Sequence, residues 1–86
     1  MSEDTELKQQ LKQMIVERLF LNVDPETIPD DANLMDTYGV DSVNIFEIVV
    51  GLEDVFGISL AEEDFSIEAF VTVNGIAELV TRKRGG

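Results

Sequence analysis

The stretch GVDSVNIFEIVVGLEDVFG, residues 39–57, decides the fold that the sequence predicts. Its apolar residues recur at helical spacing, which predicts a helix from Ser42 to Phe56, with Asp41 as the N-cap and Gly57 as the C-terminal stop. One face of this helix is apolar and is expected in the core; it carries Ile45, Ile48, Val49, Leu52 and Phe56. The opposite face is a mixed stripe of Val43, Glu47, Val50 and Asp54 with no evident partner inside the chain.

Two further helices flank this one. The pattern of Leu7, Leu11, Met14, Ile15 and Leu19 predicts a helix over about 5–21, capped by Asp4 or Thr5. A last helix is expected over 73–84 after a Thr72 cap, burying Val73, Ile76, Ala77 and Val80. Its final turn carries Arg82, Lys83 and Arg84, where cations complement the helix dipole.

The two connections are less regular. Residues 22–41 show no periodicity and form a long loop, which Ile28, Leu34 and Tyr38 are expected to pin to the core. Residues 59–70 are ambiguous, and we expect a short or irregular helix over about 61–70. There is no strand pattern and no internal repeat, so the 86 residues predict one all-α domain, a small helical bundle.

Charge restricts the partners. Eighteen acids oppose six bases for a net charge of −12, and residues 19–81 hold fourteen acids without any Lys or Arg. Such a surface repels phosphates, which excludes nucleic acid as a default partner and argues against an anionic membrane. We expect the loop acids to be solvated. Glu47, Glu53 and Asp54, beside exposed Val43 and Val50, are expected to form a docking face for basic partner proteins.

The missing residue types restrict the chemistry. The chain has no Cys and no His, and therefore no thiolate, no disulfide, no usual general base and no zinc site. It has no signal-peptide pattern and no apolar run long enough to span a membrane, which predicts a cytoplasmic protein, and we expect it to be a monomer. Ser42 opens the central helix, where free N–H groups favour a phosphate. Without a base to activate it, Ser42 is either an inconsequential helix-start serine or an acceptor modified by another enzyme.

The segment Gly39-Val40-Asp41-Ser42-Val43 resembles the Gly-x-Asp-Ser-Leu motif of acyl carrier proteins, and the likeness extends over residues 7–81. The resemblance implies a four-helix bundle and a phosphopantetheine arm, taken from coenzyme A, on Ser42. The arm would carry acyl groups as thioesters, so the protein would be a carrier and not an enzyme. The implied partners are a phosphopantetheinyl transferase and the acyl-ligase or synthase enzymes that use the carrier.

The chain departs from the family pattern at several positions. Val43 stands where the family usually has Leu, Asn44 replaces an acid common in fatty-acid-synthesis carriers, and Thr37-Tyr38 differ from the usual acidic-Leu pair. Residues 61–72 are about two residues longer than in housekeeping carriers, and residues 68–73 resemble peptidyl and D-alanyl carrier proteins. The departures favour a specialised carrier, for polyketide or other dedicated biosynthesis, beside the fatty-acid role; an aminoacyl or peptidyl carrier remains the alternative.

Three other functions compete with this one. The terminal Arg84-Gly85-Gly86 is typical of a ubiquitin-like modifier, although that fold needs strands. Asp30, Asp31, Asn33 and Asp36 suggest calcium, but an EF-hand loop that starts at Asp31 has Asp36 where Gly is required. The third is an unmodified acidic adaptor, which only a test of Ser42 separates from a carrier.

Overall fold

The computed structural model describes residues 3–64 and 66–85, and within them every regular element is helical. The α-helices are α1 (Glu3–Leu19), α2 (Leu34–Tyr38), α3 (Ser42–Phe56), α4 (Ile67–Phe70) and α5 (Val73–Gly85). Two short 3₁₀ helices join them, η1 (Pro25–Thr27) and η2 (Glu62–Asp64). The predicted all-α bundle is confirmed, and the strands that a ubiquitin-like fold requires are absent from the described part of the chain.

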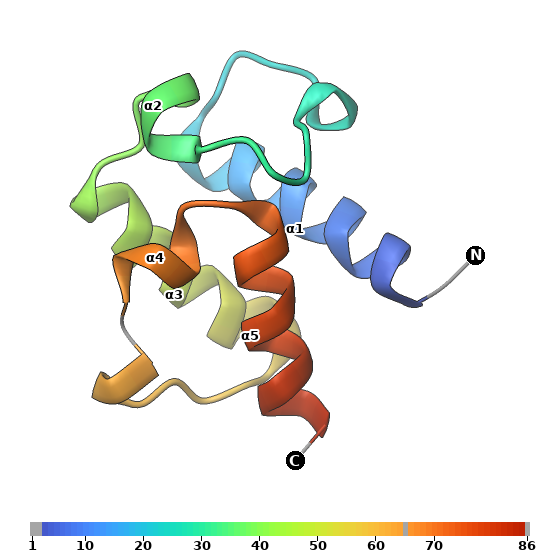
Figure 1. The fold of residues 1–86 in the computed structure, drawn as a ribbon, viewed down its shortest axis with the longest axis vertical. Helices are drawn as coiled ribbons and strands as arrows, with labels where there is room; N and C mark the ends of the chain where they lie inside the picture. Colours follow the sequence, from blue (N-terminus) through green and yellow to red (C-terminus); the bar gives the residue numbers. More distant parts are fainter. Residues whose placement is uncertain (1–2, 65, 86) are drawn as a thin grey trace.

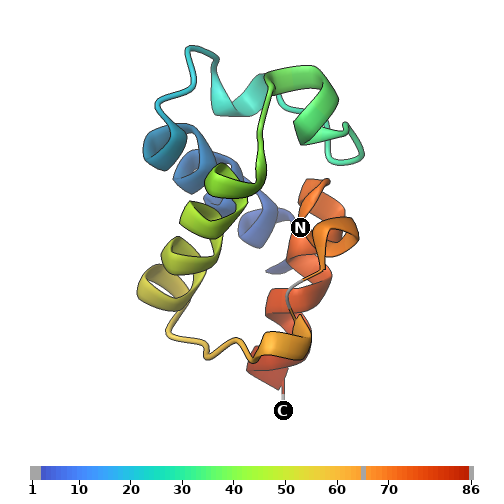
Figure 2. The ribbon, with the colours of Figure 1, turned by 90° about the vertical axis from the view of Figure 1, so that its left-hand side faces the viewer.

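The three long helices make the body of the molecule (Figure 1). α1 packs against both α3 and α5, and α4 packs against α5 and α3. In Figure 2 the connection that carries η1 and α2 crosses one end of the long helices, and the connection from α3 to η2 crosses the other end. Ser42, the first residue of α3, therefore lies at the end of the bundle that the first of these connections crosses.

The bounds of α3 are those predicted from the sequence, whereas α1 is shifted. α1 begins at Glu3, so Asp4 and Thr5 lie within its first turn and not at the N-cap position that was predicted for one of them. It ends at Leu19, two residues early, because Phe20 adopts a left-handed backbone with φ 55°. The Leu21 N–H then bonds to the Val16 carbonyl at 3.0 Å, a Schellman-type closure of the helix.

The long loop is more ordered than its lack of periodicity indicated. Asn33 caps α2 by accepting the N–H groups of Met35 and Asp36 at 2.9 and 3.0 Å. Gly39 ends α2 in the left-handed conformation, with φ 69°. A helix of five residues is too short to give an amphipathic pattern, which explains why the sequence did not predict it. Ile28 and Leu34 are buried and Tyr38 is half-buried, as expected of the residues that pin the loop.

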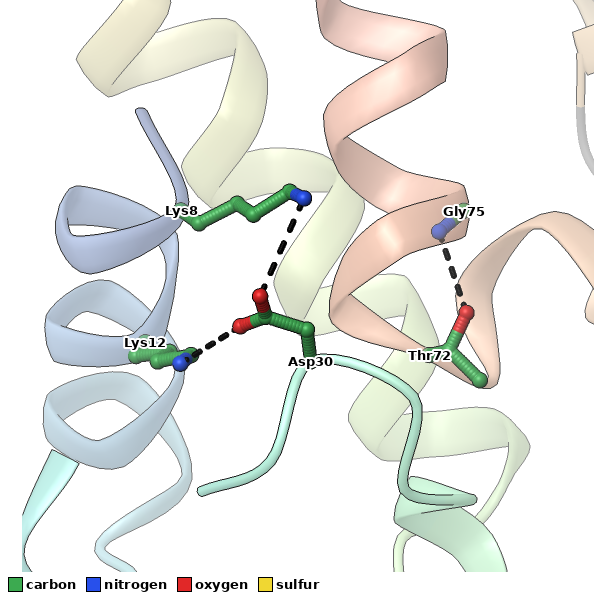
Figure 3. A network of polar contacts seen from close by, with 5 residues as sticks. All are labelled: Lys8, Lys12, Asp30, Thr72 and Gly75. Atoms are coloured by element: carbon green, nitrogen blue, oxygen red, sulfur yellow. Dashed lines mark hydrogen bonds and ion pairs between the residues drawn. The ribbon is translucent and has the colours of Figure 1, made fainter. Parts of the chain in front are cut away.

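Asp30 fixes the middle of this loop to both terminal helices. Its carboxylate is 2.6 Å from Lys12 Nζ and 3.8 Å from Lys8 Nζ, both on α1 (Figure 3). Its carbonyl accepts the Asn74 N–H of α5 at 3.0 Å. The Leu34 N–H bonds at 2.7 Å to the carbonyl of Val71, just before α5. These contacts hold the loop against α1 and the first residue of α2 against the segment that leads into α5.

Within residues 57–72, where a short or irregular helix was expected over about 61–70, the structure has two short helices, η2 and α4. The Glu53 carboxylate accepts the Leu60 N–H at 3.0 Å, and the Asp64 carboxylate accepts the Ala61 N–H at 2.8 Å. Lys83 Nζ of α5 is 2.7 Å from the same Asp64 carboxylate. These bonds stop the chain at η2 before it resumes as α4; Phe65, part of the predicted helix, lies outside the described residues. Thr72 caps α5 as predicted, accepting the Gly75 N–H at 3.0 Å (Figure 3).

The core is aliphatic, as the composition requires. The residues predicted to face it are buried or, for Leu19 and Phe56, packed half-buried against it. The structure adds residues whose burial the sequence did not predict, namely Val40, Ile58, Phe70 and Leu79. Leu79 is fully enclosed because α5 is covered by α1 on one side and α4 on another.

Candidate functional site

Ser42 is exposed at the first turn of α3, directly after a well-formed cap. The Asp41 carboxylate accepts the Asn44 N–H at 2.9 Å, and the Asn44 side chain accepts the Asp41 N–H at 3.0 Å. This reciprocal pair is a capping box, and it fixes the direction in which α3 begins. Ser42 takes no part in it, so its hydroxyl is not required to hold the helix.

The surroundings of Ser42 suit a phosphate ester. Within residues 3–64 and 66–85, neither the Ser42 hydroxyl nor the N–H groups of Ser42 and Val43 make a hydrogen bond. These two N–H groups lie at the positive end of the α3 dipole. A phosphodiester on Ser42 would therefore meet unused donors and a favourable field.

A shallow apolar groove opens beside Ser42. Its volume is about 180 Å³, and α3 and α4 supply its walls. Phe70 is buried at 1% exposure, whereas Phe46 and Ile67 remain 59% and 55% exposed. The residues that line the groove are Ser42, Ile45, Phe46, Ser66, Ile67 and Phe70. Ser66 precedes α4 without capping it through its side chain, so two serine hydroxyls border an otherwise apolar hollow.

The predicted stripe of Val43, Glu47, Val50 and Asp54 has both of its apolar residues exposed. Val43 is 69% exposed and Val50 is 37% exposed, one heptad further along α3. Glu47 lies between them and is half-buried. Phe46 was not predicted as part of this stripe, although it lies three residues after Val43 and four before Val50, the spacing that places it on the same side of the helix.

The two acids at the far end of α3 have partners within the chain, which corrects the expectation that the stripe has none. Arg18 of α1 bonds to the Asp54 carboxylate at 3.0 Å. The Glu53 carboxylate is bonded to the Leu60 N–H. The sequence could not reveal the first contact, because Arg18 and Asp54 are 36 residues apart.

Lysine partners change the titration of two carboxyls in the connections. The pKa of Asp30 is lowered, chiefly by its hydrogen bond with Lys12 and further by the charges of Lys12 and Lys8, although burial opposes this shift. The pKa of Asp64 is lowered chiefly by the Lys83 hydrogen bond and then by the Ala61 N–H. Both carboxylates act as structural anchors.

Two of the loop residues considered as calcium ligands also have structural roles. Asp30 pairs with lysines and Asn33 caps α2, so two of the four candidate calcium ligands are already engaged. Over residues 3–64 and 66–85, no three acidic side chains gather in a way that would hold a metal ion.

Comparison with known proteins identifies the class. The profile of a family described as "Phosphopantetheine attachment site" matches residues 9–80. Polyketide-8 synthase acyl carrier protein 2 of Streptomyces avermitilis is 35% identical over 78 residues, covering 91% of this chain and 85% of its own length. The acyl carrier protein of Bdellovibrio bacteriovorus is 34% identical over 73 residues, covering 85% and 88%. The chain belongs to the phosphopantetheine-attachment family of acyl carrier proteins.

The fold agrees with this assignment. A solved structure of the acyl carrier protein of Enterococcus faecalis superimposes with a TM-score of 0.71, covering 95% of this chain and 99% of the other, at 24% identity. The family's prosthetic group is a covalently attached phosphopantetheine, and its members are carriers that synthases and phosphopantetheinyl transferases act on. None of the helices in the described residues is long and apolar enough to cross a membrane.

Proposed function

We propose that this protein carries acyl groups as thioesters on a phosphopantetheine arm attached to Ser42. The observation that carries the proposal is the position of Ser42, whose free, exposed hydroxyl lies at a capped helix start beside an apolar groove. The residues fit the group: two unused N–H donors are available to the phosphate, and the groove offers apolar contact to the pantetheine chain beyond it. When bound, phosphopantetheine supplies the thiol that this Cys-free chain lacks.

The attachment step requires a second protein. The Ser42 oxygen attacks the coenzyme A phosphorus that bears pantetheine, and the phosphoanhydride bond to that phosphorus breaks. The new phosphodiester joins Ser42 to the arm, and adenosine 3′,5′-bisphosphate leaves. A base must accept the hydroxyl proton, and no side chain of the described residues is hydrogen-bonded to the Ser42 hydroxyl to do so. The transferase therefore provides the base, and this chain provides an exposed serine whose hydroxyl its own fold does not use.

The exposed side of α3 next to Ser42 is the proposed docking surface, defined by Val43, Phe46, Glu47 and Val50. Two exposed apolar residues flank the attachment site within one turn of it, and Glu47 adds a charge that a basic enzyme surface complements. Glu53 and Asp54, which the sequence placed in this surface, contribute less in the proposal because their carboxylates have intramolecular partners.

The pathway proposed is a dedicated one in preference to housekeeping fatty-acid synthesis. The resemblance implies that fatty-acid-synthesis carriers commonly have an acid at the position of Asn44, so this chain lacks one docking charge near Ser42, and the Asn44 side chain serves the capping box. We expect the modified protein to support slower turnover in a housekeeping fatty-acid synthase system than that system's own carrier. Equal turnover would assign the chain to the housekeeping role.

Intact-protein mass tests the attachment. Apo protein is incubated with coenzyme A and a phosphopantetheinyl transferase of broad specificity, and the modified peptide is mapped. The wild type should gain the mass of one arm, and Ser42→Ala should gain none. Ser66→Ala is the matched control, since Ser66 borders the same groove, and it should gain mass as the wild type does. A wild type that gains no mass would favour the unmodified adaptor, and a Ser42→Ala variant that gains mass would move the site elsewhere.

A further inference from the structure

Asp54, at the far end of the stripe of Val43, Glu47, Val50 and Asp54, is already paired with a basic residue of another helix. Arg18 Nη2 lies 3.0 Å from Asp54 Oδ2. The Arg18 side chain is 28% exposed, whereas the Asp54 side chain is 72% exposed. The Arg18 guanidinium thus extends from α1 to the stripe while most of the Arg18 side chain is covered. The Asp54 carboxylate is exposed to solvent, but it is already paired with this guanidinium.

Gly51 makes this approach available. A Cβ at Gly51 would lie 2.7 Å from both Cδ and Nε of Arg18 and would also overlap Met14 Sδ. The Arg18 stem therefore crosses α3 directly over the Gly51 backbone, one turn before Asp54. This packing fixes the guanidinium against Asp54 more firmly than two freely rotating surface side chains would allow.

We propose that Arg18 masks Asp54 from basic partners, so that Glu47 is the acid of the stripe that recognises them. The proposal rests on the docking surface assigned above. Arg18 takes the place on Asp54 that a partner's Arg or Lys would take. Enzymes whose basic residue faces Glu47, close to Ser42, are thereby favoured over enzymes whose basic residues face the far end of α3. Fourteen acids on one chain segment offer many places for a basic surface to bind, and masking one of them restricts the orientation.

Transferase kinetics test the mask. The value of kcat/KM for Ser42 modification is measured at low salt with a transferase whose docking surface is basic. Arg18→Gln exposes Asp54 and should raise kcat/KM by about two- to fivefold, the factor that one exposed charge pair is worth. Asp54→Asn leaves an unpaired guanidinium on the stripe and should lower it. The double variant should return close to the wild-type value, because both charges are gone.

Arg82→Gln is the matched control, since it makes the same change in net charge on α5 and should leave kcat/KM unchanged. Arg18→Met keeps an apolar stem over Gly51 and should behave like Arg18→Gln, which separates the charge from the packing. The increase should disappear at high salt. If Arg18→Gln and Arg18→Met are no faster than Arg82→Gln, Arg18 is only a structural tether and the mask is wrong.

A second measurement does not depend on Ser42. A tetra-lysine peptide is titrated into the unmodified protein while backbone amide shifts are followed by NMR. In the wild type, Glu47 should respond and Asp54 should not; in Arg18→Gln, Asp54 should respond as well. Equal Asp54 responses in the two proteins would overturn the mask. If no variant gains mass with the transferase, the carrier proposal fails, and the peptide titration still decides whether Arg18 covers Asp54.

Discussion

Asp41 and Asn44 hold each other in a closed pair of hydrogen bonds at the start of α3, with each side chain accepting the other's backbone N–H. Ser42 lies between them in the chain and outside the pair. The residue that starts the helix and the residue proposed to carry the arm are therefore neighbours with separate roles.

Mutation should separate these roles. Asp41→Ala removes the cap and is expected to lower the free energy of unfolding by about 0.5–2 kcal/mol. Ser42→Ala should change it by no more than about 0.5 kcal/mol, because the hydroxyl makes no bond within the described chain. Urea unfolding of the unmodified proteins measures both. Equal losses for the two variants would show that Ser42 supports the fold.

The ion pairs of Asp30 with Lys8 and Lys12, called the Asp30 clamp below, should weaken in acid. The pKa of Asp30 is lower in the folded protein than its usual value of 3.8, mainly because Lys12 hydrogen-bonds to the carboxylate. A lowered folded pKa means that the contribution to stability is present above the usual value and is lost as the pH falls through the folded value. Asp30→Asn should cost up to about 1 kcal/mol at pH 7, since the side chain is 44% exposed, and progressively less below pH 4.

Asp31→Asn is the control for this comparison. Asp31 is the next residue and is exposed, so its substitution removes the same charge without breaking a clamp. Unfolding free energies of wild type and both variants at pH 7, 5 and 3 give the measurement. The clamp is wrong if Asp30→Asn and Asp31→Asn behave alike at pH 7.

Replacement of Phe20 by glycine should stabilise the protein. It adopts φ 55° at the end of α1, a conformation that costs a residue with a Cβ about 1–2 kcal/mol, and its side chain is 91% exposed. Phe20→Gly removes that cost but loses more chain entropy on folding, so a net gain of about 0.5–1 kcal/mol is expected. The measurement is the melting temperature, with Phe20→Ala as a control that keeps the strain and should show little gain. A lower melting temperature for Phe20→Gly would mean that the Phe20 side chain contributes contacts of its own.

Self-repulsion should hold the stability below what the core allows. The net charge is −12, and the ion pairs that the structure shows among its described side chains engage Asp30, Asp54 and Asp64, which leaves most of the acids to repel one another. Added salt screens the remaining repulsion more than it weakens these pairs, so NaCl should raise the melting temperature. Magnesium and calcium at equal millimolar concentrations should raise it equally. A melting temperature that does not change with added NaCl would contradict the self-repulsion. An increase in melting temperature with calcium but not with magnesium would support the calcium-site alternative.

Local rules in the sequence determined the existence of the three long helices and the position of the candidate site. The bounds of α3 follow from Asp41, the periodic apolar residues and Gly57, which all lie within one segment. The burial of the predicted face and the exposure of Val43 follow from the same period. Ser42 could be singled out because a helix start, and the motif around it, are local features of the chain.

The tertiary structure alone decided what distant residues do to one another. α2 exists because Asn33 and Gly39 close a short turn that the rest of the chain pins in place, and too few residues are involved to show a period. Arg18 reaches Asp54 because α1 crosses α3 at Gly51, and no pattern along the chain records that crossing. Sequence spacing fixes which face of a helix is apolar, whereas the packing of one helix on another fixes which surface charges remain available to a partner.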